Sequence, residues 1–406
     1  MTYGDRMSRE QTAHGRTMFP NPFRPGAGHM PPYLAGRTKE RDEFKRLLDQ
    51  EVVMANPILT GLRGVGKTVL LETFKPLAQS AGWLWVGTDL SESASINESN
   101  LITRLITDVS VISSELTVLI ESEKSGPRER RLDNGFLMER CNETPGLMSD
   151  KLRCVLELVH DALPADCKGV VFAYDEAQNL SDHAEEKEYP LSVLLEVFQS
   201  VQKKGIPFML LLTGLPTLFP KLVDARTYAE RMFRVMFLER LNETESKDAI
   251  KKPISSARCP VTFADGLINS IWKYSGGYPY FIQFICREAF DVILQQRQLG
   301  QKLAVPMKQV IRKLDSDFFA GRWANATDRQ RVLLQIIAGL PSDGEEFSVK
   351  EVVAASKTQP KPFSSSHVNQ MLASLAAVGL VYKNRYGKYS FAVPLLADFI
   401  RRQADA

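Results

Sequence analysis

The sequence has little cysteine and lacks any apolar run long enough to cross a bilayer. Its five cysteines are scattered between Cys141 and Cys286 and never show a C-x-x-C spacing, which argues against a disulfide framework or a zinc site. The five histidines form no metal-binding pair. The most apolar run, residues 207–219, is too short for a membrane span, and the first thirty residues show no apolar core of a signal peptide. We therefore expect a protein of the reducing cytoplasm without a membrane partner.

Neither sign of charge dominates. The formal net charge is +3 over 406 residues, which is too small to imply a polyanion partner. An apolar content of 44% and a charged content of 24% are typical of a globular protein. The chain is long enough for two or three domains, each with its own core.

Proline and glycine gather near the start of the chain. We expect residues 1–18 to be a disordered leader. Residues 19–32 carry several prolines and are predicted to be extended rather than helical. Phe19 and Phe23 suggest that this segment packs along the domain that follows it.

One motif is present in full. Residues 61–68 read G-L-R-G-V-G-K-T and fit the phosphate-loop pattern G-x-x-x-x-G-K-[ST] at each fixed position. Glycines allow the tight turn whose N–H groups cradle a phosphate, Lys67 neutralises the β- and γ-phosphates, and Thr68 ligates Mg²⁺. A strand at 57–60 and a helix from about Lys67 are predicted on either side; the alternative is a chance glycine-rich turn. The residues expected to hold the nucleotide here are Gly61, Arg63, Gly64, Val65, Gly66, Lys67, Thr68 and Val69.

A second motif ends a strongly apolar run. Residues 169–176 read G-V-V-F-A-Y-D-E, which predicts a buried parallel strand with acidic residues at its carboxyl end. Asp175 would hold Mg²⁺, and Glu176 would be the general base that polarises the attacking water. The alternative is an exposed acidic strand end. Another buried strand, 207–213, ends at Thr213, which either contacts the γ-phosphate and the water or belongs to a plain turn.

The remaining segments alternate between helices and short strands. Strands are expected at 83–88 and 235–238, and helices at 96–120, 151–163 and 191–202. The charged stretch 121–145 is predicted to be a solvated loop, with a binding insertion as the alternative. A helix capped by Asn242 should stop before Pro253, and further helices are expected at 264–274 and from Pro279 onward.

The last eighty residues predict a winged helix-turn-helix. Helices are expected at 327–340, at 349–356 after a Ser348 cap and at 367–377 after Ser365 or Ser366, followed by a hairpin that turns at 386–387. This module would contact either double-stranded DNA or a protein, or would act in autoinhibition. The residues expected to face DNA are Lys383, Arg385 and Lys388 on the wing and His367, Asn369 and Gln370 on the second helix of the motif.

Taken together, these motifs resemble the AAA+ ATPases of the origin-recognition and STAND-like branch, over about residues 19–402. The resemblance implies an α/β P-loop fold, in which a parallel sheet has helices on both faces and is followed by a helical lid and a winged helix. It implies ATP and Mg²⁺ as ligands. It also implies that backbone at Gly36 and Arg37, just before a helix capped by Thr38, meets the adenine.

Two further roles are implied by the resemblance. Arg231 lies just before the last strand, where these ATPases place a finger for a neighbour's γ-phosphate; Arg234 is the alternative, and a surface ion pair is the other interpretation. The third lid helix begins G-Y-P-Y around Pro279, as in the STAND branch, and lacks the arginine that origin-recognition ATPases commonly carry there. This departure implies slow turnover, with the nucleotide acting as a switch.

The predicted domains are an extended segment (1–32), the AAA+ domain (33–240), the lid (241–325) and the winged helix (326–406). The leading hypothesis is an ATP-dependent switch that repositions the winged helix toward DNA or a protein partner. The alternatives are a DNA-loading or transposition-type regulator that forms ATP-dependent filaments on DNA, as a homo-oligomer, and a non-catalytic ATP-binding scaffold.

Overall fold

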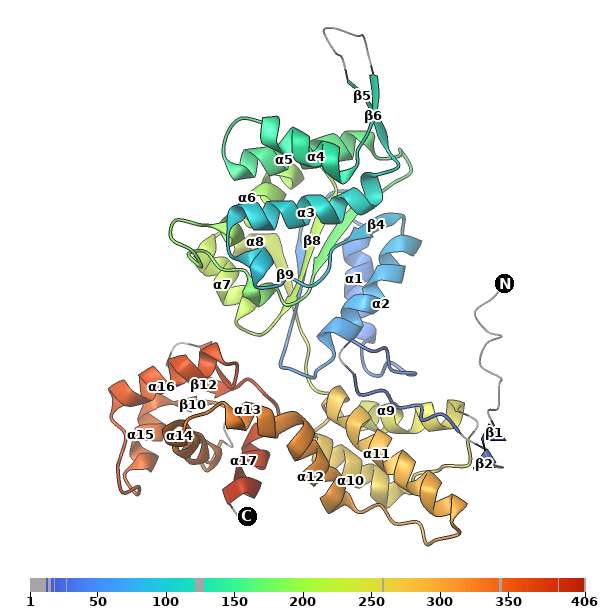
Figure 1. Ribbon diagram of the computed structural model, residues 1–406, viewed down its shortest axis with the longest axis vertical. Helices are drawn as coiled ribbons and strands as arrows, with labels where there is room; N and C mark the ends of the chain where they lie inside the picture. Colours follow the sequence, from blue (N-terminus) through green and yellow to red (C-terminus); the bar gives the residue numbers. More distant parts are fainter. Residues whose placement is uncertain are drawn as a thin grey trace. The chain divides into compact units, whose positions relative to one another are not determined.

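The computed structural model describes residues 12–13, 16–17, 19–26, 28–120, 128–257, 259–342, 345–385 and 387–404 (Figure 1). The chain forms two compact units. One holds the chain up to Gly36 together with Arg240–Thr327, and the other holds Arg37–Glu239 together with Asp328–Ala406. Nowhere in the described ranges is there a helix of the length and apolar character that a bilayer crossing requires.

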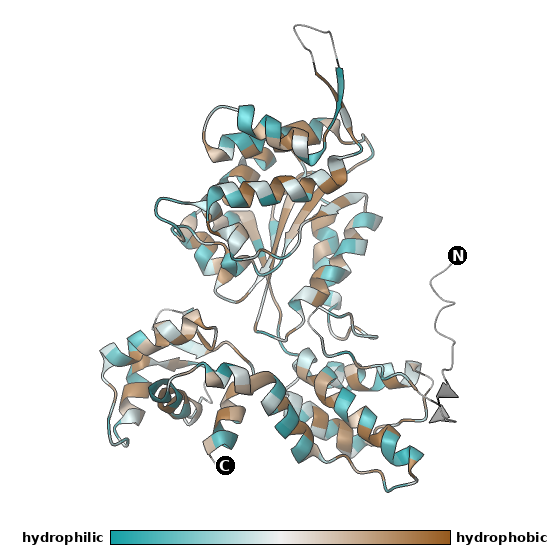
Figure 2. Cartoon of the chain, in the orientation of Figure 1, coloured by the Kyte–Doolittle hydropathy of each residue, from teal (hydrophilic) through white to brown (hydrophobic). Residues whose placement is uncertain are grey.

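A five-stranded parallel sheet organises the unit that contains the phosphate-loop motif. Its strand order is β4-β7-β8-β3-β9. Every residue of β3, β7 and β8 is buried, as expected for central strands of a parallel sheet with both faces covered. Figure 2 shows hydrophobic residues along the strands of this sheet. The strands are β3 (Asn56–Thr60), β4 (Trp83–Val86), β7 (Gly169–Tyr174), β8 (Phe208–Gly214) and β9 (Phe233–Phe237).

Helices cover both faces of this sheet. Alternate residues of β7 point to opposite faces, and Val170, Phe172 and Tyr174 share one core cluster with α3, α5 and α6. Figure 1 shows α1 and α2 together beside the sheet, apart from those helices. The helices between Arg37 and Glu239 are α1 (Thr38–Leu48), α2 (Lys67–Ser80), α3 (Glu98–Ser113), α4 (Asn134–Glu143), α5 (Met148–Ala162), α6 (Pro190–Lys203), α7 (Leu218–Ala225) and α8 (Ala229–Met232).

Two predictions around residues 96–145 were wrong. Helix α3 ends at Ser113 rather than near Ile120, and the stretch expected to be a loop contains the second strand of a β-hairpin and helix α4. In the hairpin β5 (Thr117–Ile120) pairs antiparallel with β6 (Arg128–Arg131). The Ser113 hydroxyl donates to the carbonyl of Leu132 at 2.7 Å, and serine and threonine favour such non-helical contacts. Residues 121–127 of the predicted loop lie outside the described residues.

The other unit is helical. Its first helix, α9 (Glu243–Ser256), begins with the predicted capping box between Asn242 and Glu245. It does not stop before Pro253, because this buried proline lies in the last turn, where little helix remains to be disrupted. The helices that follow are α10 (Asp265–Ser275), α11 (Pro279–Gln298), α12 (Met307–Leu314) and α13 (Ala320–Ala324), with a π-helical turn at Asp315–Phe319.

The proline-rich segment belongs to this helical unit, not to the α/β unit that follows it in sequence as predicted. Phe23 is 1% exposed and packs between the rings of Phe263 and Phe290, at 6.1 Å and 6.5 Å between centroids. The Asn21 amide donates to the carbonyl of Arg287 at 2.9 Å. Of the predicted disordered leader, the structure describes only two short strands, β1 (Thr12–Ala13) and β2 (Arg16–Thr17), which pair antiparallel.

The C-terminal residues form three helices and a small antiparallel sheet of order β10-β12-β11. Ser348 caps α15 as predicted, but α16 is capped by Ser364, one residue before the predicted caps, because that hydroxyl reaches the N–H of His367. A further helix, α17, contacts α14 and was not predicted. The elements are α14 (Asp328–Ala338), β10 (Phe347–Ser348), α15 (Val349–Ser356), α16 (Ser365–Ala377), β11 (Val381–Arg385), β12 (Lys388–Phe391) and α17 (Leu396–Ala404).

Candidate functional site

The loop at residues 61–66 lies at the carboxyl end of β3 and leads directly into α2. Gly64 and Gly66 have φ values of 76° and 94°, a conformation that glycine adopts at little cost. A Cβ at Gly61 would lie 2.7 Å from the carbonyl oxygen of Leu238, so this position has no room for a side chain. The sequence pattern therefore has a steric basis at all three glycines.

Lys67 is the first residue of α2, and its ammonium lies across the loop. Its Nζ donates to the carbonyl oxygens of Gly61 at 3.0 Å and Leu62 at 3.2 Å. Burial lowers the pKa of Lys67 to about 8, although the nearby carboxylates of Asp175 and Glu176 act in the opposite direction. A poorly hydrated cation in a loop of this kind is suited to binding an anion.

Thr68 and Asp175 meet at the ends of α2 and β7. The Thr68 hydroxyl donates to Asp175 Oδ2 at 2.5 Å, and the N–H of Glu176 donates to Asp175 Oδ1 at 2.8 Å. Hydroxyl and carboxylate oxygens are the ligands that Mg²⁺ prefers. No cluster of three or more His, Cys, Asp or Glu suited to a metal occurs among the described residues.

Glu176 has a partner that the sequence did not reveal. Its carboxylate accepts a hydrogen bond from the amide of Gln178, and Gln178 Oε1 accepts from the N–H of Leu215 at 3.1 Å. Glu176 itself has a φ of 52°, which is uncommon for a residue with a side chain and is found at functional sites. The amide of Gln178 thus links the predicted general base to the loop that follows β8.

Thr213 lies on β8, directly opposite Leu59 of the strand that carries the phosphate loop. Its side chain is fully buried, and its hydroxyl has no hydrogen-bond partner among the described residues. The hydroxyl of Thr60 on β3 is also buried and has no hydrogen-bond partner among the described residues. Buried polar groups are nearly always paired, so the unpaired hydroxyl of Thr213 is compatible with a polar ligand at this edge of the sheet.

A third carboxylate near this edge was missed. Asp89 follows β4, and its backbone forms an isolated parallel β-bridge with the backbone of Asp175. Burial, Asp175 and Glu176 together raise the pKa of Asp89 above its ordinary value. The sequence held a signal for it, since Asp89 comes directly after the predicted strand 83–88, as Asp175 does after its own strand.

Arg37 contacts the phosphate loop through its side chain. Its Nη2 donates to the carbonyl oxygens of Val65 at 3.0 Å and Glu239 at 2.9 Å, and Nη1 lies 3.5 Å from Glu40 Oε1. Helix α1 begins at Thr38 with Arg37 at the cap position, so the predicted Thr38 cap was wrong. The predicted adenine contact of the backbone at Gly36 and Arg37 stays a prediction. Pro279 opens α11 as predicted, in the other compact unit, and its role at the nucleotide also stays a prediction.

The two finger candidates differ in their surroundings. Strand β9 begins at Phe233, two residues before the predicted start, and therefore includes Arg234. Arg234 Nε lies 3.2 Å from Glu43 Oε1, which is the surface ion pair considered as an alternative role. Arg231 lies in α8, and its side chain is exposed without a hydrogen bond or ion pair to any described residue.

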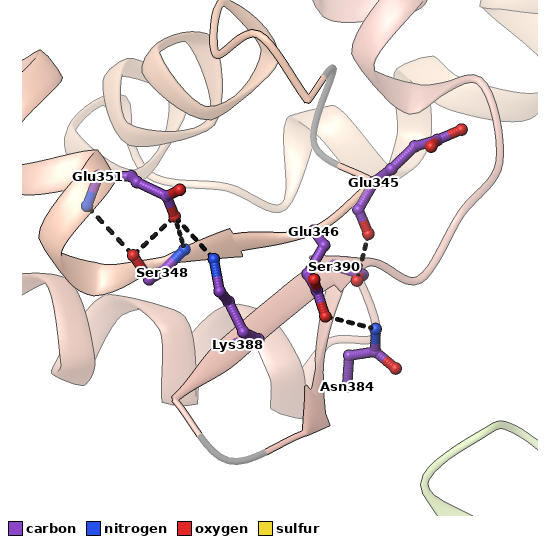
Figure 3. A network of polar contacts seen from close by, with 7 residues as sticks. All are labelled: Glu345, Glu346, Ser348, Glu351, Asn384, Lys388 and Ser390. Atoms are coloured by element: carbon purple, nitrogen blue, oxygen red, sulfur yellow. Dashed lines mark hydrogen bonds and ion pairs between the residues drawn. The ribbon is translucent and has the colours of Figure 1, made fainter.

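The C-terminal sheet holds one of the predicted DNA-facing cations in a polar network (Figure 3). The Glu351 carboxylate accepts from the N–H and the hydroxyl of Ser348, both at 2.6 Å, and from Lys388 Nζ at 3.2 Å. The Asn384 amide on β11 donates at 3.4 Å to the carboxylate of Glu346, which directly precedes β10. Lys388 is thus engaged in fixing the sheet to α15. The side chain of Arg385 and all of Tyr386 lie outside the described residues.

The comparisons with known proteins agree with this fold. A Walker-type ATPase of Pyrococcus abyssi is similar to the chain, with 16% sequence identity, a TM-score of 0.57 and coverage of 91% of this chain and 96% of that one. The ORC2 protein of Aeropyrum pernix in its ADP form has 14% identity, a TM-score of 0.56 and coverage of 94% and 98%. The chain has the P-loop AAA+ fold found in origin-recognition ATPases.

Sequence comparison adds little to this. The family described as "Domain of unknown function (DUF8462)" matches residues 316–400, which include α14 to α16 and the C-terminal sheet. The comparison with curated proteins gave no match.

Proposed function

We propose that this protein is an ATP-dependent switch that binds ATP with Mg²⁺ and hydrolyses it slowly. The observation that carries this proposal is the meeting of Lys67, Thr68 and Asp175 at the carboxyl edge of the sheet, with a hydrogen bond of 2.5 Å between the last two. In open α/β sheets ligands bind at this edge. ATP and Mg²⁺ are the ligands that this set of groups fits: backbone N–H groups and an ammonium for phosphate, and two oxygen ligands for the metal.

In this proposal each residue of the chain has one task. Lys67 moves from the carbonyls of its own loop to the β- and γ-phosphates, and Thr68 with Asp175 would hold the metal, which neutralises phosphate charge when bound. Glu176 accepts a proton from the attacking water. Thr213 contributes its unpaired hydroxyl to the γ-phosphate or the water.

Slow turnover is supported by the surroundings of Glu176. Its carboxylate is already hydrogen bonded to the Gln178 amide, so the base must give up or share this contact before it can accept a proton. A non-catalytic scaffold is the limiting case, in which this contact is never released.

The nucleotide state would be passed to the C-terminal module. We propose that residues 33–240 are the AAA+ domain, 241–325 the lid and 326–406 a winged helix that meets double-stranded DNA or a protein. The exposed His367, Asn369 and Gln370 on α16 support a contact surface there. The network of Lys388 with Glu351 speaks for a structural rather than a phosphate-binding role of that one cation.

A calorimetric titration tests the nucleotide proposal. The native protein should bind ATP with Mg²⁺, and Lys67→Ala should abolish binding because it removes the cation that offsets the triphosphate charge. Arg46→Ala is a matched control, because this exposed arginine contacts Glu43 and the carbonyl of Asp42 on its own helix, α1. Equal ATP affinity of Lys67→Ala and the native protein would refute the assignment.

A further inference from the structure

Arg37 is an arginine buried at a place where the chain passes between its two compact units. Only 6% of its surface is exposed. The first unit runs to Gly36, and Arg37 is the first residue of the second. The chain returns to the first unit at Arg240, directly after Glu239, whose carbonyl accepts from Arg37 Nη2. Arg37 therefore lies where the chain enters its unit from the helical unit, and its side chain is hydrogen bonded to Glu239, where the chain leaves for the helical unit again.

The same nitrogen atom also reaches into the phosphate loop. One Nη2 donates to Val65 at 3.0 Å and to Glu239 at 2.9 Å, and a guanidinium nitrogen of this type carries two hydrogens to do so. A change in the position of either carbonyl therefore acts on the other through one planar group. Glu40, whose Oε1 lies 3.5 Å from Nη1, balances the charge.

The contact with Val65 bears on the phosphate through the peptide plane. The carbonyl of Val65 and the N–H of Gly66 belong to one planar trans peptide, in which they point in opposite directions. A donor that fixes the carbonyl on one side therefore fixes the N–H on the other. Gly66 is the cap residue of α2 and has a φ of 94°, so its N–H belongs to the turn that would cradle the β-phosphate.

We propose that Arg37 is a positioning residue that orients the Val65–Gly66 peptide toward the phosphate and couples the occupancy of the loop to the chain crossing at Glu239. This inference rests on the proposed nucleotide site and deepens it. It assigns to the Arg37 side chain a role that is separate from any contact of the neighbouring backbone with adenine. A charge-assisted hydrogen bond is roughly twice as strong as a neutral one, which suits this role.

The experiment uses inorganic pyrophosphate and ADP on the full chain. Arg37→Ala and Arg37→Met both remove the donors, and Met keeps most of the apolar stem if Ala should disturb folding. Both should weaken pyrophosphate and ADP binding by the same factor, about tenfold to a hundredfold. Arg37→Lys, which keeps a cation, should recover part of this loss. Arg46→Ala, on the helix that Arg37 precedes, is the control.

Hydrogen exchange supplies the second measurement. In the native protein, pyrophosphate should slow exchange in two segments, residues 61–68 and 236–242. In Arg37→Met, saturating pyrophosphate should slow exchange in the first segment only, a result that a merely structural arginine would not produce.

Three results would overturn the inference. Native-like pyrophosphate affinity of both variants would remove the role in the loop, and equal protection of 236–242 in native and variant protein would remove the coupling. A loss for ADP without a loss for pyrophosphate would place Arg37 at the adenine instead. If the native protein bound neither probe, the proposed function itself would fail, and the inference with it.

Discussion

The hydroxyl of Thr68 donates a 2.5 Å hydrogen bond to the carboxylate of Asp175, which lies 107 residues further along the chain. This pair brings together the first turn of α2 and the end of β7. Asp175 is 3% exposed, so its charge is withheld from water. A divalent cation bound here would replace the hydrogen bond between Thr68 and Asp175. The hydroxyl oxygen and the carboxylate would then both contact the cation.

Removal of the metal should therefore weaken nucleotide binding in a way that depends on this pair. We expect EDTA to lower the ATP affinity of the native protein, and Asp175→Asn and Thr68→Val to be insensitive to EDTA because they have lost an oxygen ligand or its charge. Thr68→Ser keeps the hydroxyl and should remain sensitive. Calorimetric titrations with and without Mg²⁺ measure this; a Thr68→Val protein that still responds to Mg²⁺ like the native one would contradict it.

The affinity for ATP should fall as the pH rises above about 8. Burial lowers the pKa of Lys67 to about 8 in the free protein, so the ammonium is mostly charged at pH 7 and mostly neutral at pH 9. Phosphate binds the charged form, and binding at pH 9 must therefore take up a proton, which costs affinity up to about tenfold per pH unit. Titrations at pH 7, 8 and 9 in buffers of different ionisation enthalpy report both the affinity and the proton uptake. Unchanged affinity without proton uptake would show that Lys67 does not titrate in this range.

Glu176→Gln should keep ATP bound and lose hydrolysis, by about a hundredfold to ten-thousandfold, because an amide cannot accept the proton of water. Gln178→Leu removes the donor that holds the Glu176 carboxylate. It should therefore raise turnover while leaving ATP affinity intact. A single-turnover phosphate-release assay separates the two effects. If Glu176→Gln hydrolyses ATP at the native rate, another group positions the water.

Arg231→Ala should lower turnover only where subunits assemble, since a finger acts on a neighbour's nucleotide and contributes roughly a thousandfold or more where it operates. Arg234→Ala is the matched comparison, because that side chain pairs with Glu43 of its own subunit. Turnover measured against protein concentration, alongside the mass in solution, gives the answer. A protein that stays monomeric with ATP and hydrolyses normally would exclude the finger.

The predicted role of the C-terminal hairpin in duplex binding can be tested one cation position at a time. Lys388→Ala breaks the contact with Glu351 and should leave duplex affinity unchanged, because that ammonium already pairs with a carboxylate of α15. Lys383→Ala combined with Arg385→Ala should lower the slope of log affinity against log salt by about two units if both cations meet phosphates. Salt titrations of duplex binding with ATP present distinguish these cases. No duplex binding at low salt, or equal slopes for native and double variant, would leave a protein partner as the occupant of this surface.

The sequence by itself determined the local parts of this protein. Gly64 and Gly66 predict a left-handed turn, because only glycine adopts this conformation without strain. The capping boxes at Asn242 and Ser348 indicate helix starts, because their contacts join residues only three positions apart. The apolar runs of β7 and β8 likewise predict buried strands, because this signal lies within the residues of the strand itself. The boundaries predicted near Ser113, Pro253 and Ser364 were wrong.

Only the tertiary structure decided which of these parts meet. The parallel sheet places β8 between β7 and β3, and this order alone brings Thr213, Asp175 and the phosphate loop to one edge. The contacts of Arg37 with Val65 and of Lys388 with Glu351 join residues that no motif relates. A single sequence carries no distance between residues far apart in the chain, because that distance is set by the packing of the whole core. The side-chain contacts of Gln178 with Glu176 and of Arg37 with Val65 became visible only in the folded chain.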